Sequence, residues 1–80
     1  MNGKQIVSEI MKMRGYTNAA LADKLNYPTV SGVSERLRGK QDMRVDTLVK
    51  FLEAMDCEVI VKSKLNDKTV WTIDGKQEEN

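Results

Sequence analysis

Residues 17–40 read TNAALADKLNYPTVSGVSERLRGK, and this segment holds two short helix signals with a turn signal between them. Thr17 stands at an N-cap position, because its hydroxyl can accept a hydrogen bond from a backbone N–H two or three residues on. The run rich in alanine and leucine that follows favours helix. Asn26 favours a left-handed helix end, and Pro28 biases the residue before it away from helix. We therefore predict a helix that ends near Asn26 and a turn that contains Pro28.

The second helix signal runs from Ser31 to Arg38 and is barely two turns long. Val33 and Leu37 are its apolar positions, Ser31 is a candidate N-cap, and Gly39 follows its last turn. The other positions are polar, charged or glycine. One narrow side of this helix is therefore expected to pack, while the rest faces solvent.

Helical periodicity continues on both sides of this segment. Apolar residues at spacings of three and four predict a helix over residues 4–14, which Gly15 ends. The same pattern predicts a helix over residues 45–56, whose buried stripe is widened by Phe51. Together these elements predict a four-helix body over residues 4–56.

After Asp56 the hydrophobic period changes to two, which is typical of strands. Two alternating runs flank Asn66 and Asp67, so residues 57–74 predict a β-hairpin. Residues 75–80 are expected to form a flexible acidic tail.

The length of the hairpin loop determines which side chains share a face. A three-residue loop over residues 66–68 would set four apolar side chains on one side, Val59, Val61, Trp71 and Ile73. A two-residue loop over residues 66–67 would put Trp71 on the face opposite Val59 and Val61. We expect the three-residue loop, because it gives the helices one continuous apolar surface.

The chain has 80 residues, so we expect a single domain over residues 1–80. Its one cysteine, Cys57, cannot close an intramolecular disulfide, and the absence of histidine leaves no zinc-ligand set. Histidine is also the usual general base, so we expect no enzyme, no metal and no cofactor. No apolar run approaches the roughly 18 residues of a membrane helix, and residues 1–4 lack the core of a secretion signal. A cytoplasmic protein without membrane contact is the expectation.

Thirteen basic residues stand against twelve acidic ones, and the net charge of +1 favours no class of partner. The distribution is uneven, however. Between Arg36 and Arg44 there are four basic residues and one acidic residue, whereas residues 74–80 contain three acidic residues and one basic residue. A basic run beside a short polar helix indicates phosphate binding more strongly than a basic run alone.

These elements, taken in order, resemble the lambda-repressor-like (Xre/Cro-type) helix-turn-helix family. The resemblance covers about two thirds of the chain, and three segments carry it: residues 17–25 (TNAALADKL), 33–40 (VSERLRGK) and 43–55 (MRVDTLVKFLEAM). It implies a mainly α fold, in which a four-helix lambda-repressor-like helix-turn-helix domain precedes the C-terminal β-hairpin. It also implies sequence-specific binding of double-stranded DNA by a small prokaryotic or phage transcriptional regulator that acts as a repressor.

The chain departs from the family pattern at four places. Asn26 stands where the family usually has glycine, and Tyr27–Gly32 is one residue longer than the common turn. Arg36 occupies a position that is often apolar, with Leu37 taking over the packing. A strand pattern follows Asp56 where many relatives have a fifth helix, as in relatives that dimerise through a terminal β element.

The resemblance implies that residues 31–38 form the recognition helix, because the major groove of B-DNA, about 12 Å wide, admits one helix. The polar residues on its outward side are then the base readers, namely Ser31, Ser34, Glu35 and Arg38. Phosphate contacts set position without reading sequence, and the candidates for this role are Thr17, Asn18, Thr29, Arg36, Lys40 and Arg44. Two alternatives stay open, that Ser31 only caps the helix and that Glu35 is a solvated charge.

One short helix reads about four base pairs, so proteins of this kind bind as two-fold dimers. The hairpin is the candidate dimer interface, because its outer face carries Ile60 and Val70 and its edge is free to pair. The alternative is that the hairpin only covers its own helices. A second function also stays open, an antitoxin-type interaction module that binds and masks a partner protein and regulates its own operon.

Overall fold

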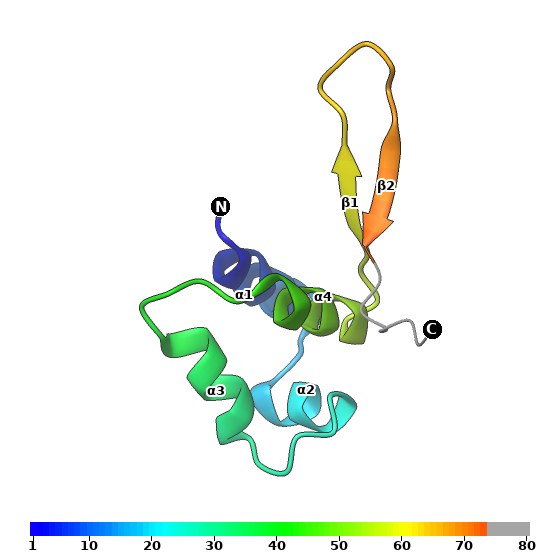
Figure 1. The fold of residues 1–80 in the computed structure, drawn as a ribbon. Coiled ribbons are helices and arrows are strands. Elements are labelled where there is room, and N and C mark those ends of the chain that lie inside the picture. The colour runs from blue at the N-terminus through cyan, green and yellow to red at the C-terminus, as the bar shows by residue number, and fades with distance from the viewer. Residues whose placement is uncertain (74–80) are drawn as a thin grey trace, which may run out of the picture.

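The computed structural model describes residues 1–73, which form four helices and then a two-stranded antiparallel hairpin (Figure 1). The elements are α1 (Gly3–Arg14), α2 (Asn18–Lys24), α3 (Ser31–Arg38), α4 (Val45–Ala54), β1 (Val59–Lys62) and β2 (Val70–Ile73). The mainly α class with a C-terminal β-hairpin is therefore confirmed. Asp74 and the expected tail over residues 75–80 lie outside the described residues. Within the described part, no helix has the length and apolar character needed to cross a membrane.

Short-range signals set the end of α1 and both ends of α2 where the sequence predicts them. α1 stops at Gly15, whose φ of 74° is left-handed. The Thr17 side chain accepts a hydrogen bond from the backbone N–H of Ala20, 3.0 Å away, and so caps α2. Asn26 adopts a φ of 61°, and the chain turns there toward α3. The predicted turn between the two helices is confirmed.

One helix cap and one helix end differ from the prediction. Ser31 does not cap α3, because Val30 before it already has helical dihedrals and takes the N-cap position without a side-chain hydrogen bond. The Ser31 hydroxyl oxygen instead lies 2.8 Å from the hydroxyl oxygen of Thr29. α4 ends at Ala54, two residues early, since the chain turns left-handed at Asp56 with a φ of 62°.

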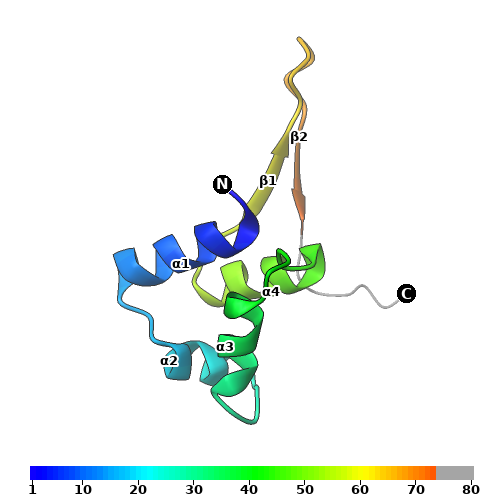
Figure 2. The same cartoon turned by 90° about the vertical axis from the view of Figure 1, so that its left-hand side faces the viewer.

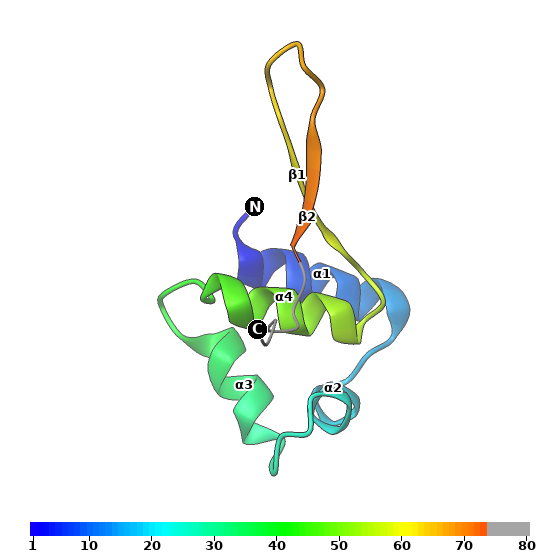
Figure 3. The same cartoon turned by 45° about the vertical axis from the view of Figure 1, so that its right-hand side comes forward.

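The core lies where the four helices meet, and its largest fully buried side chains are Phe51, Leu21, Met55, Val7, Val33 and Val49. α1 packs against α4, and α2 packs against α3. Figures 2 and 3 show the resulting layers from two further sides, with the hairpin at one end, α1 and α4 in the middle, and α2 and α3 at the other end. The apolar side of α3 is thus anchored to the body through Val33.

The hairpin register puts four apolar side chains on one face, by pairing Val59 with Ile73 and Val61 with Trp71. This shared face is as predicted, but the predicted loop position is wrong. A loop over residues 66–68 would pair Leu65 with Thr69, whereas the Ser63 N–H donates to the Thr69 carbonyl over 2.9 Å. The N–H groups of Leu65 and Thr69 are already bonded to the side chains of Ser63 and Asp67, which shifts the register by two residues.

The expectation that this face covers the helices is wrong. The hairpin projects away from the helical body in all three views (Figures 1–3). Val61 and Trp71 are 44% and 54% exposed, and among the strand residues Val59 alone packs against the core. On the other face, Ile60 and Val70 are 52% and 53% exposed. Both faces of the hairpin are therefore open to a partner.

Candidate nucleic-acid interface

α3 lies with α2 at the end of the molecule opposite the hairpin (Figure 1). Val33 is buried and Leu37 is half-buried, so these two side chains hold α3 to the body. The four candidate base readers are Ser31, Ser34, Glu35 and Arg38. Ser34 and Glu35 lie three and four residues after Ser31, and four and three residues before Arg38, which puts all four on one side of the helix. Three of them are exposed and Ser34 is half-buried. The structure therefore brings all four together.

Ser34 is linked to the first residue of α2. Asn18 Nδ2 donates to Ser34 Oγ over 3.2 Å, and Ser34 Oγ lies 3.5 Å from the Val30 carbonyl oxygen. An amide nitrogen carries two hydrogens, so Asn18 keeps one for a further acceptor. Three candidate phosphate-binding residues thus lie beside the base readers, two at the start of α2 and one bonded to Ser31: Thr17, Asn18 and Thr29.

A groove of about 540 Å³ lies between the end of α3 and the start of α4. The other three candidate phosphate-binding residues line it: Arg36, Lys40 and Arg44. Glu35 and Asp42 line it too, so the walls carry both signs of charge with an excess of positive side chains. Arg44 forms an exposed ion pair with Asp46, 3.6 Å from Nε to Oδ1, and such pairs are weak in water. Lys40 and Arg44 can therefore turn toward an anion in this groove.

Arg36 is held against the protein surface. Its guanidinium lies 4.8 Å from the centre of the Tyr27 ring, and its Nη1 donates to the Gly32 carbonyl over 2.8 Å. Gly32 allows the ring to approach, because a Cβ added there would lie 3.0 Å from Tyr27 Cδ2. Gly32 and Arg36 are four residues apart on α3, but Tyr27 precedes the helix, and no periodicity in the sequence indicates that its ring lies against them. Arg36 must therefore give up contacts with Tyr27 and Gly32 if its guanidinium turns toward a phosphate.

Asp42 ties the loop between α3 and α4 to the start of α1. Its carboxylate accepts hydrogen bonds from the N–H groups of Gly3 and Lys4, each over 3.0 Å, and from that of Met43 over 2.8 Å. The hydrogen bond from Gly3, followed by that from Met43, lowers the pKa of Asp42 below its ordinary value of 3.8. These hydrogen bonds hold Asp42 in place in the wall of the groove between α3 and α4. The sequence contains no signal for the contact with α1, because the partners are far apart along the chain.

An Asp42→Asn variant should be less stable than the wild type at neutral pH. The pKa of this carboxyl is lower in the folded than in the unfolded chain, so its contribution is complete above the unfolded pKa and is lost as the pH falls through the folded pKa. Urea unfolding midpoints, compared at neutral pH and at steps below pH 3.8, should show a gap that closes in acid. Asp23→Asn, at an exposed position of α2, should show no gap. Equal midpoints for Asp42→Asn and wild type at neutral pH would contradict this anchor.

Comparison with known proteins adds no relative, since no family model, curated protein or solved structure matches the chain. Among residues 1–73, no three His, Cys, Asp or Glu side chains are grouped so that they could hold a metal ion. The function of the end that carries α2 and α3 therefore has to be inferred from the side chains present there. This end presents hydroxyls, a carboxylate and a guanidinium on one side of a short helix, with basic side chains in the adjoining groove.

Proposed function

We propose that the chain is a sequence-specific double-stranded DNA-binding protein, a small prokaryotic or phage transcriptional repressor of the lambda-repressor-like helix-turn-helix type. One observation carries this proposal, the open side of α3 at the outer end of the body, formed by Ser31, Ser34, Glu35 and Arg38. A single helix with polar side chains on its open side is what the major groove admits. In this arrangement α2 lies across the DNA backbone.

Each polar side chain of α3 has chemistry that suits a base edge. The Glu35 carboxylate can accept from a cytosine amino group, and the hydroxyls of Ser31 and Ser34 can meet donors or acceptors. Arg38 stands one turn beyond Ser34 and can reach a guanine or a phosphate. The hydrogen bond from Asn18 holds the Ser34 hydroxyl in place before DNA arrives.

Phosphate contacts on either side of the reading helix would set its position. Asn18 Nδ2 has one hydrogen left for a phosphate oxygen, next to its bond with Ser34. Lys40 and Arg44 line the groove at the other end of α3. These contacts carry no sequence information, so their loss should weaken binding to all duplexes about equally.

We propose a second copy of the chain as the partner of the hairpin, through the edge of β2. β2 consists of Val70, Trp71, Thr72 and Ile73 and carries no charge, whereas β1 contains Lys62. Charged side chains are one means by which natural sheet edges avoid pairing, so β2 is the less protected edge. Pairing of β2 with its two-fold mate would extend the hairpin to four strands and bring two reading helices onto one duplex. Ile60 and Val70 share one face of that sheet.

The exposed hairpin also favours a second candidate function, the antitoxin-type module that masks a partner protein and regulates its own operon. Apolar side chains open on both faces suit a protein partner as well as a second copy. Light scattering after size-exclusion chromatography separates the two cases. A mass of about twice 9.1 kDa supports the homodimer, and a monomer at high micromolar concentration favours the partner-masking function.

Selection of bound duplexes from a random library, repeated over a salt series, tests the proposed function. We expect enrichment of one two-fold-symmetric sequence and an affinity that falls with salt, as phosphate contacts require. Arg38→Ala should either make the salt slope shallower by about 0.9 for each bound chain, if Arg38 binds a phosphate, or cost about 1–3 kcal/mol at one base pair of each half-site, if it reads a guanine. Lys50→Ala, at an exposed position of α4 outside the groove between α3 and α4, should change neither the salt slope nor the preferred sequence. Absence of binding to any duplex at low salt would overturn the proposal.

A further inference from the structure

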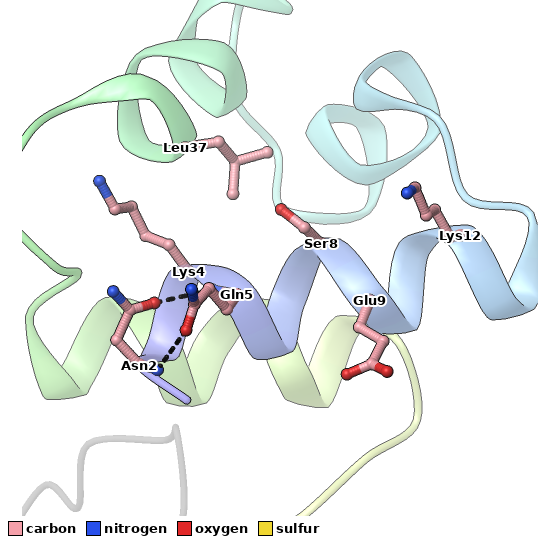
Figure 4. Close-up of a pocket in the computed structure, with 7 residues that line it drawn as sticks. All are labelled: Asn2, Lys4, Gln5, Ser8, Glu9, Lys12 and Leu37. Carbon is pink, nitrogen blue, oxygen red and sulfur yellow. Dashed lines mark hydrogen bonds between the residues drawn. The ribbon is translucent and has the colours of Figure 1, made fainter.

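A second groove, of about 550 Å³, lies between α1 and the C-terminal part of α3 (Figure 4). Its α1 wall includes Lys4, Ser8 and Lys12, which follow one another at intervals of four and therefore share one side of the helix. Leu37 contributes the opposite wall from α3. The recognition helix of the proposed function thus has a groove on each side, one toward α4 and one toward α1.

The two lysines and the serine differ in how far the fold already engages them. Lys4 Nζ donates a hydrogen bond to the carbonyl of Gly39 at the end of α3, so this ammonium group already has a partner within the chain. Within residues 1–73, the side chains of Ser8 and Lys12 make no hydrogen bond or ion pair, and both residues are exposed. Glu9 is the only acidic residue in the lining, and Figure 4 shows its carboxylate on the side of α1 away from Lys12 and Leu37. The side of the groove next to α3 therefore offers one hydroxyl and one uncompensated ammonium group.

We propose that this groove binds a backbone phosphate of duplex DNA, with Lys12 as the cation and Ser8 as a hydrogen-bond donor. The inference rests on the proposed function, since it is the reading helix that would bring a duplex to this place. A helix in the major groove has a phosphate backbone on each of its two sides. Lys40 and Arg44 serve one side, and Lys12 with Ser8 serves the other. Neither Ser8 nor Lys12 is marked by the helix-turn-helix pattern of the sequence.

The test compares Lys12→Gln with Lys50→Gln on a duplex obtained by selection. Lys50 is exposed on α4 and lines neither groove, and glutamine suits helices about as well as lysine does. Lys12→Gln should make the slope of log affinity against log salt shallower by about 0.9 for each bound chain, and so by about 1.8 for the proposed dimer. Its preferred sequence should stay that of the wild type. Lys50→Gln should leave both unchanged.

A phosphate scan with neutral methylphosphonate links locates the contact. Neutralising the phosphate that Lys12 binds should weaken binding of the wild type but not of Lys12→Gln, while every other sensitive phosphate stays sensitive in both. A Lys12→Gln salt slope equal to that of Lys50→Gln, or an unchanged phosphate scan, would overturn this inference and leave the proposed function standing. A wild-type chain that binds no duplex at low salt would overturn both.

Discussion

A Phe51→Ala variant is expected to lose about 3–5 kcal/mol of unfolding free energy, because it leaves a cavity at the centre of the core. Phe51 is fully buried on α4, and its ring centre lies 6.2 Å from that of Tyr27 in a tilted arrangement. Tyr27 in turn packs against Gly32 of α3. Phe51 therefore supports the turn that precedes α3, as well as the core itself.

Thermal unfolding followed by circular dichroism measures this loss. Small domains have total stabilities near the low end of about 5–15 kcal/mol, and each kcal/mol shifts their Tm by about 4–8 °C. The Tm of Phe51→Ala should accordingly fall by at least about 12 °C. Val45→Ala is the matched control, since Val45 lies on the same helix and is largely exposed, and its Tm should move little. A Tm for Phe51→Ala close to that of the wild type would show that this ring does not hold the core.

If β2 pairs with a second copy as proposed, a Thr72→Pro variant should be monomeric and should bind its selected duplex roughly 100-fold or more weakly, because the two α3 helices of the proposed dimer would gain avidity of this order. The Ser63 N–H bonds to the Thr69 carbonyl, and ladder bonds alternate along a strand. The N–H of Thr72 therefore points away from β1, toward the free edge of β2. Proline at such a position keeps the internal ladder and removes a donor that a second copy would need.

Lys62→Pro is the matched control for this experiment. By the same alternation, the Lys62 N–H points outward at the edge of β1, so its loss leaves the edge of β2 intact. Light scattering should give a dimer mass for Lys62→Pro and a monomer mass for Thr72→Pro. A dimer for both variants, a monomer for both, or the reverse assignment would contradict pairing through β2.

The helices and the turn between them could be predicted from the sequence, because short-range interactions determine them. Gly15 ends α1, Thr17 caps α2, and Asn26 takes left-handed dihedrals, each through its own backbone or a neighbour within three residues. The side of α3 that holds the candidate base readers follows from helical spacing alone. The shared face of the hairpin follows from alternation in the same way.

The remaining features depend on contacts between residues far apart in the sequence, or on competition between two local interactions. Asp42 accepts hydrogen bonds from the start of α1, nearly forty residues away in the sequence, and no periodicity in the sequence predicts such a contact. Ser31 loses its capping role to the helical backbone of Val30. The hairpin was expected to cover the helices because its apolar face matches them, but among the strand residues only the half-buried Val59 packs against the core. Apolar patterning identifies a face and leaves open which partner covers it.

Repeated duplex selection with three alanine variants tests most directly whether α3 reads bases. Ser34→Ala and Glu35→Ala should each change the preferred base at one or two positions, at about 1–3 kcal/mol per base pair, while Glu58→Ala, exposed outside α3, should select the wild-type sequence. All three variants selecting the wild-type sequence with wild-type affinity would contradict entry of α3 into the major groove.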